Sequence, residues 1–158
     1  MNLSLVHLHL ALNHSPLYTE LFAFALLAIG LLWRKQTLVT AGLVVAIIGA
    51  LCAFVGVYTG DGAEKIIKQS PPIAGVDPKL IDPHSQAADY FSTAAYITAG
   101  LALISLIIGW RRAAGRFRWL DGLIALCVLV SFVAAGRTAL LGGRIHHPEV
   151  RAVTGGSP

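Results

Sequence analysis

Residues 37–58 read TLVTAGLVVAIIGALCAFVGVY, a stretch without a single charged side chain. A helix needs about 20 mainly apolar residues to cross the hydrocarbon core of a bilayer. This stretch has that length and is apolar on every side, so as a helix it would present no polar face to water. It therefore predicts a transmembrane helix.

Three further stretches have the same character, at roughly 17–33, 87–110 and 119–141. Only 13% of the chain is charged, against about 25% in soluble proteins. Backbone groups that face lipid must be hydrogen-bonded within their own segment, which favours helices. We therefore predict an all-α fold, an integral membrane four-helix bundle in which the whole chain forms one domain surrounded by lipid. Residues 59–86 are expected to form an outer loop and residues 150–158 a disordered tail.

Small side chains recur within the second stretch. Gly42, Gly49 and Gly56 stand at every seventh position, with Ala46 and Ala53 between them. Such a stripe lets a neighbouring helix approach closely, as ordinary packing in membrane bundles requires.

Basic residues predict the orientation. The two short connections between the expected helices contain no acid, and both fall on the same side of the membrane. The positive-inside rule places this side in the cytoplasm, so both termini and the long loop should face outward. Residues 1–16 contain no Lys or Arg, which argues against a cleavable signal peptide. We expect a bacterial inner membrane protein whose functional face points to the periplasm. The basic residues of the two connections are Arg34, Lys35, Arg111, Arg112, Arg116 and Arg118.

Several functional classes lack their sequence signals. The formal charge of +4 is not arranged as a basic stripe interleaved with aromatic residues, so nucleic acid is not an expected partner. No Gly-x-Ser-x-Gly nucleophile motif is present. Cys52 and Cys127 form no Cys-x-x-Cys-His pattern, which argues against a covalently attached c-type haem. An electron carrier or a subunit of a complex is thus favoured over a stand-alone enzyme.

The histidines carry the main functional signal, because all of them fall on the predicted outer side. Histidine is the commonest metal ligand in proteins. Acidic residues follow the same trend at Glu64 and Glu149, and Arg137 and Arg144 stand near the outer end of the last helix. The histidines are His7, His9, His14, His84, His146 and His147.

Four segments carry a resemblance to known sequences: His7-Leu-His9-Leu-Ala-Leu-Asn13-His14-Ser-Pro16, Thr59-Gly-Asp-Gly-Ala-Glu64, His84 with Ala87-Ala88, and Gly142-Gly-Arg-Ile-His-His-Pro-Glu149. Together they resemble a family of small predicted bacterial four-helix membrane proteins with no assigned function. That family usually has a basic residue where this chain has His146, so the resemblance implies that His147 matches its recurrent histidine. Some relatives look fused to cytochrome c-like segments, which implies redox work.

Our first hypothesis is that the bundle binds b-type haem near the outer face, for electron transfer in a respiratory or photosynthetic complex. Haem b requires axial ligands and an apolar slot between helices, but no cysteine. His14, His84 and His147 would supply ligands from three helix ends, and His7 or His9 would supply a fourth. Four histidines are enough for one haem or two. Which of His146 and His147 is the ligand stays open. Arg137 and Arg144 would pair with the propionates.

Two alternatives stay open. The same groups could hold a bare copper, zinc or iron ion, with His14, His84, His147, Glu64 and Glu149 as ligands, since imidazoles and a carboxylate suit these metals. The bundle could instead be a structural accessory subunit without a cofactor. In every case we expect other subunits of a redox complex, or further copies of this chain, as partners.

Overall fold

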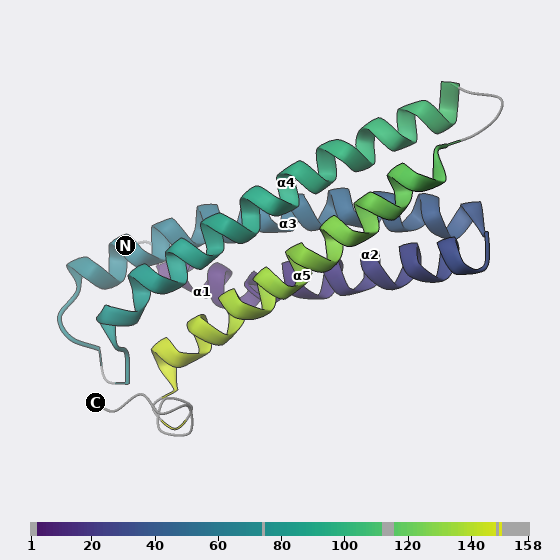
Figure 1. The fold of residues 1–158 in the computed structure, drawn as a ribbon. Coiled ribbons are helices and arrows are strands. Elements are labelled where there is room, and N and C mark those ends of the chain that lie inside the picture. The colour runs from purple at the N-terminus through teal and green to yellow at the C-terminus, as the bar shows by residue number, and fades with distance from the viewer. Residues whose placement is uncertain (1–2, 74, 112–115, 148, 150–158) are drawn as a thin grey trace.

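The chain forms five α-helices and one short 3-10 helix within the residues that the structure, a computed structural model, describes: 3–73, 75–111, 116–147 and 149. Figure 1 shows α2 to α5 running along the length of the molecule, with α1 beside α3. In chain order the elements are α1 (Leu3–Leu12), α2 (Ser15–Leu32), α3 (Gln36–Gln69), η1 (Pro78–Leu80), α4 (Ile81–Arg111) and α5 (Arg118–His146).

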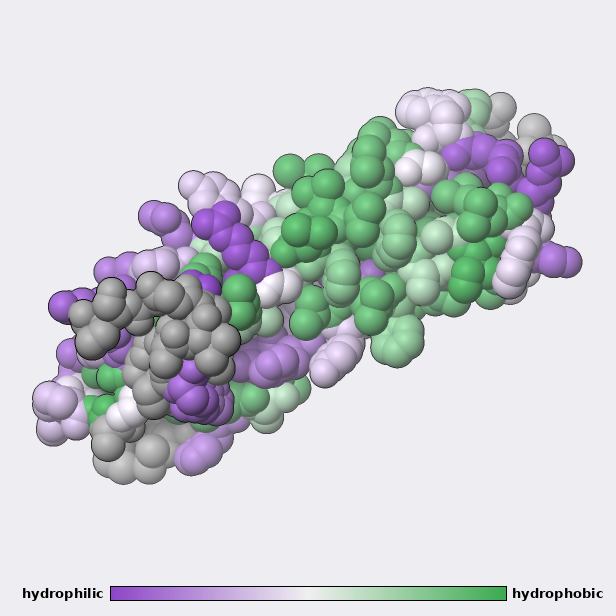
Figure 2. Space-filling model, turned by 60° about the horizontal axis from the view of Figure 1, so that its bottom comes forward, coloured by the Kyte–Doolittle hydropathy of each residue, from purple (hydrophilic) through white to green (hydrophobic). Residues whose placement is uncertain are grey.

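The four long helices are apolar on their outer surface as well as between one another. Four helical spans are long and apolar enough to cross a membrane: Leu5–Leu32, Gln36–Gln69, Pro78–Arg111 and Arg118–Ile145. Phe54 and Val133 are 60% and 64% exposed, as expected for side chains that face lipid rather than water. Figure 2 shows hydrophobic residues gathered across the middle of the visible face and hydrophilic residues at both ends. The all-α four-helix membrane bundle is confirmed, and the chain is a multi-pass membrane protein.

The two ends of the bundle differ. We call one the arginine end, because Arg34, Arg116 and Arg118 lie at the α2–α3 turn and at the start of α5. We call the other the histidine end; it holds α1, the start of α2, the α3–α4 connection and the end of α5 (Figure 1). The tail 150–158, expected to be disordered, lies outside the described residues.

The connection at the histidine end is shorter than the sequence analysis predicted. α3 continues to Gln69 and α4 begins at Ile81, so residues 70–80 replace the expected loop 59–86. Lys68 bridges Glu64 one turn earlier at 2.8 Å and Asp82 of α4 at 2.7 Å, and an i,i+4 pair of this kind supports a helix. The polar composition of this segment concealed the unbroken continuation of α3 from Tyr58 to Gln69.

α2 packs against the glycine stripe of α3. A Cβ added at Gly42 would lie 2.7 Å from Leu27 Cγ, and one added at Gly49 would lie 3.1 Å from Glu20 Oε1. A side chain at Gly42 would force Leu27 to shift and one at Gly49 would be tightly packed, so the stripe sets the close approach of the two helices. Leu27 is fully buried in the core cluster that this contact creates.

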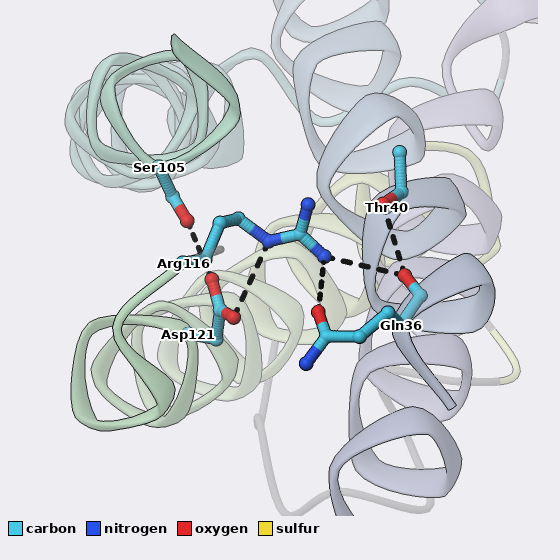
Figure 3. Close-up of polar contacts among 5 residues, drawn as sticks. All are labelled: Gln36, Thr40, Ser105, Arg116 and Asp121. Carbon is cyan, nitrogen blue, oxygen red and sulfur yellow. Dashed lines mark hydrogen bonds and ion pairs between the residues drawn. The ribbon is translucent and has the colours of Figure 1, made fainter. Parts of the chain in front are cut away.

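A buried ion pair closes the arginine end (Figure 3). Asp121 of α5 accepts a hydrogen bond from Ser105 of α4 at 2.5 Å and lies 3.4 Å from Arg116 Nε. The Arg116 guanidinium also donates to the Gln36 side-chain oxygen at 2.8 Å and to the Gln36 backbone carbonyl at 3.2 Å. The same carbonyl accepts a hydrogen bond from the Thr40 hydroxyl. The Asp121 and Arg116 side chains are only 1% and 9% exposed. The network thus ties the start of α5 to α4 and to the first turn of α3.

Candidate functional site

A cavity of about 280 Å³ opens between the helices at the histidine end. Four histidines line it, each from a different part of the chain: His9 of α1, His14 before α2, His84 of α4 and His147 after α5. The rest of the lining is mainly apolar and includes Leu17, Ala53, Val57, Ala88, Phe91 and Ala135. This mixture of an apolar wall with a few polar groups is typical of small-molecule sites, whose volumes start at about 300 Å³.

His9 is oriented by the α3 backbone. Its Nδ1 lies 3.2 Å from the Gly56 carbonyl oxygen and 3.2 Å from Thr59 Oγ1. Thr59 donates its hydroxyl proton to the Val55 carbonyl at 2.8 Å, so its oxygen accepts from His9. Because both partners of Nδ1 are acceptors, Nδ1 carries the ring proton and Nε2 carries the lone pair.

His84 is oriented in the same way by α5. Its Nδ1 donates to the Thr138 carbonyl oxygen at 3.0 Å, which again places the lone pair on Nε2. The ring lies directly over Gly142, where an added Cβ would be 2.9 Å from His84 Cε1. His9 lies over Gly60 similarly, with 3.1 Å between an added Cβ and His9 Cε1. Each ring therefore donates a hydrogen bond to a backbone carbonyl and packs against a glycine, which we call its glycine seat.

The other two histidines of the cavity repeat this tautomer. His14 Nδ1 bonds the side-chain oxygen of Asn13, and His147 Nδ1 lies 2.8 Å from Glu149 Oε1. Both acceptors are oxygens that hold the proton on Nδ1. In metal sites the ligating histidine almost always donates its other ring N–H to a carbonyl or carboxylate, which orients the ring and raises its basicity. All four cavity histidines thus have the hydrogen bonding of Nε2 ligands.

His9 and His84 form the central pair. Their ring centroids are 6.5 Å apart and their planes make an angle of 74°. Two imidazoles on opposite sides of one metal ion, with metal–nitrogen bonds of about 2 Å, have centroids about 6 Å apart. The separation of the two rings is therefore close to that of two imidazoles that hold one metal ion. Both rings also line a second cavity of about 100 Å³, whose lining includes Asp61, Glu64 and Asp89 beside apolar residues.

The described residues contain no group of three or more His, Cys, Asp or Glu side chains placed to hold a metal ion. Glu64, predicted as a metal ligand, lines the second cavity and pairs with Lys68. Glu149 binds His147 instead, and both side chains are more than half exposed. The predicted five-ligand set does not converge around one point in this arrangement.

Three further predicted residues do not line the cavity. His7 and Arg137 are exposed, and neither these two nor Arg144 lines the two cavities described above. The side chain of His146 lies outside the described residues. The propionate role of the two arginines stays a prediction.

Sequence reasoning missed the groups that orient the rings, namely Gly56, Thr59, Thr138 and the two glycine seats. The signal was partly present, since Thr59-Gly60 and Gly142 belong to the segments that carry the family resemblance. What the sequence lacked was the pairing of those segments with His9 and His84, which only the packed helices reveal.

Comparison of the chain with protein-family models, with curated proteins and with solved structures finds no match. The family resemblance stays a prediction, and the function has to be argued from the cavity itself.

Proposed function

We propose that the protein is a membrane-bound electron-transfer protein that would hold b-type haem at the histidine end through His9 and His84. The observation that carries this proposal is the paired hydrogen bonding of the two rings. Each donates Nδ1–H to a carbonyl oxygen of a neighbouring helix, and their centroids are 6.5 Å apart.

Haem suits this site better than a bare ion does. A porphyrin supplies four ligands of its own, so two histidines complete the coordination of its iron. A bare copper, zinc or iron site in this chain would need further protein ligands, and no third metal-binding side chain joins the pair among the described residues. The mainly apolar lining of the larger cavity favours a hydrophobic group.

Each part of the site has a separate task. Bound haem would supply the one-electron iron couple. The Gly56 and Thr138 carbonyls hold the two imidazoles in one orientation and keep their protons on Nδ1. Phe91 and the alanines of the cavity wall exclude water, which tunes the potential of the iron. His14 and His147 line the same cavity and would border the haem that His9 and His84 hold.

The setting also supports a redox role. The basic residues of the arginine end favour a cytoplasmic location for that end, which would put the haem near the periplasmic face of a bacterial inner membrane. The protein has little mass outside the bilayer, so we expect it to pass electrons to other subunits of a redox complex or between copies of itself.

The test is a titration of the detergent-purified chain, stripped of any cofactor, with ferric haem followed at the Soret band. We expect saturable binding that His9→Ala and His84→Ala each abolish. His7→Ala is the matched control, because His7 lies on the same helix two residues from His9 and is exposed; it should bind as the parent does. Binding that survives both His9→Ala and His84→Ala would overturn the assignment, as would stoichiometric copper, zinc or iron without porphyrin in the purified protein.

A further inference from the structure

Glu20 of α2 is an acid buried inside the membrane-spanning part of the bundle. Its side chain is 0% exposed, and neither carboxylate oxygen has a hydrogen-bond partner among the described residues. Asp121, the other fully buried acid of the described chain, differs, because it is bound by Ser105 and Arg116. Glu20 thus lacks what normally stabilises a buried acid.

The carboxyl lies one helical turn from the histidine cavity. Pro16 and Leu17, four and three residues before Glu20, line the cavity on α2, and Ala53 lines it on α3. Gly49, one turn before Ala53, is the residue that Glu20 touches: an added Cβ there would lie 3.1 Å from Glu20 Oε1. Glu20 therefore lies next to the cavity, on the side that faces the arginine end of the bundle.

Within the part of the chain that the structure describes, no charged side chain bonds this carboxyl. α2 packs mainly against α3 and α5. The titratable side chains of those helices nearest its depth are the half-buried Cys52 of α3, the half-buried Cys127 of α5 and Arg137 of α5, which is exposed on the outer surface. None of them bonds Glu20. An ionised carboxylate buried without a partner is far costlier than the neutral acid, and ionisable groups inside membranes characteristically mark proton pathways.

We propose that Glu20 is a proton-binding site of the membrane interior, which holds its proton as the neutral acid and exchanges it through the adjacent cavity. The step is a simple acid–base equilibrium: the Glu20 O–H bond breaks, the proton passes to water or to a basic group in the cavity, and the carboxylate takes a proton back by the same route. Such a site would let a change of charge in the cavity be balanced by a proton. The proton site itself does not depend on haem binding.

The first test uses dicyclohexylcarbodiimide on the full chain in detergent without added haem. This hydrophobic reagent adds to a protonated carboxyl and ends as a stable N-acylurea that contains all atoms of both reactants. Mass spectrometry of fragments should locate one adduct at Glu20. A water-soluble carbodiimide should instead modify exposed acids such as Asp82 and spare Glu20.

Matched variants and infrared spectroscopy complete the test. Glu20→Gln, which keeps the shape of the side chain, should lose the adduct, whereas Glu64→Gln should keep it. The infrared band of a protonated carboxyl should be present in the parent, shift in heavy water and be missing in Glu20→Gln. The proposal would be overturned if dicyclohexylcarbodiimide formed no adduct at Glu20 of the parent protein. It would also be overturned if the infrared band assigned to Glu20 did not shift in heavy water. Neither outcome bears on haem binding, which the Soret titration tests separately.

Discussion

The close packing of His84 against Gly142 predicts how a substitution at Gly142 would displace the His84 ring. In Gly142→Ala the new Cβ would lie 2.9 Å from His84 Cε1, which is 0.5 Å short of the 3.4 Å at which ordinary contact begins. The ring must move by about that amount. The His84 hydrogen bond to Thr138 is already 3.0 Å long, and N–H···O bonds rarely exceed about 3.2 Å. The substitution therefore weakens the bond that orients the ring.

The expected effect follows from what such outer-shell contacts contribute elsewhere. Loss of a partner that orients a ligating histidine typically costs about 10- to 100-fold in affinity for the metal. We expect Gly142→Ala to bind ferric haem about 10- to 100-fold more weakly than the parent, which corresponds to about 1.4–2.7 kcal/mol. The assay is the Soret titration of the purified protein, with circular dichroism to check that helix content is unchanged.

Gly136→Ala is the matched control. It lies on the same helix, lines neither cavity, and a Cβ added there meets nothing within 4 Å. Both substitutions replace glycine by alanine inside a helix, which by itself stabilises a helix by about 0.8–1.0 kcal/mol. Gly136→Ala should keep the parental haem affinity and unfold at a slightly higher temperature. Equal haem affinities for the two variants would refute the argument that the glycine seat positions a haem ligand at His84.

Two further predictions concern the frame that holds the site. Asp121→Ala leaves the buried Arg116 guanidinium without its carboxylate partner and should destabilise the bundle by about 3 kcal/mol. Thermal unfolding in detergent measures this loss, and an unchanged midpoint would contradict the prediction. Gly42→Ala places a Cβ 2.7 Å from Leu27 Cγ and should cost about 1–3 kcal/mol. In the same assay Gly122→Ala, which meets nothing within 4 Å, should be neutral or stabilising, and the reasoning fails if the two glycines respond alike.

The bundle itself was predictable because its signal is local. Lipid demands about 20 apolar residues in each helix, and this demand shows directly in the composition of residues 37–58 and of the other three stretches. The glycine stripe on α3 was visible for the same reason, since its seven-residue spacing places it on one face. The structure adds that α2 is the helix that packs there.

The ends of the helices were less predictable. α1 was missed because ten residues cannot span a bilayer, and the continuation of α3 to Gln69 was missed because the segment after Tyr58 is polar. Both errors fall where the chain leaves the hydrocarbon core, so hydropathy no longer distinguishes helix from loop.

The choice among the histidines needed tertiary structure. His7 and His9 are two residues apart, and residues with that spacing do not share a face of a helix, so only one of them can face α3. The sequence does not say which one; the structure places His9 against Gly56 and Thr59 and leaves His7 exposed. The sequence also did not single out His9 and His84 as a pair, because that contact joins α1 to α4 across the bundle.

The measurement that tests the central claim most directly is an absorption spectrum of the detergent-purified protein, first oxidised and then reduced with dithionite. Haem held by two histidines predicts a Soret band that shifts and sharpens on reduction, together with distinct α and β bands. The amplitude should fall in Gly142→Ala and vanish in His84→Ala. A visible region without these bands, in protein produced with ample haem, would contradict the proposed function.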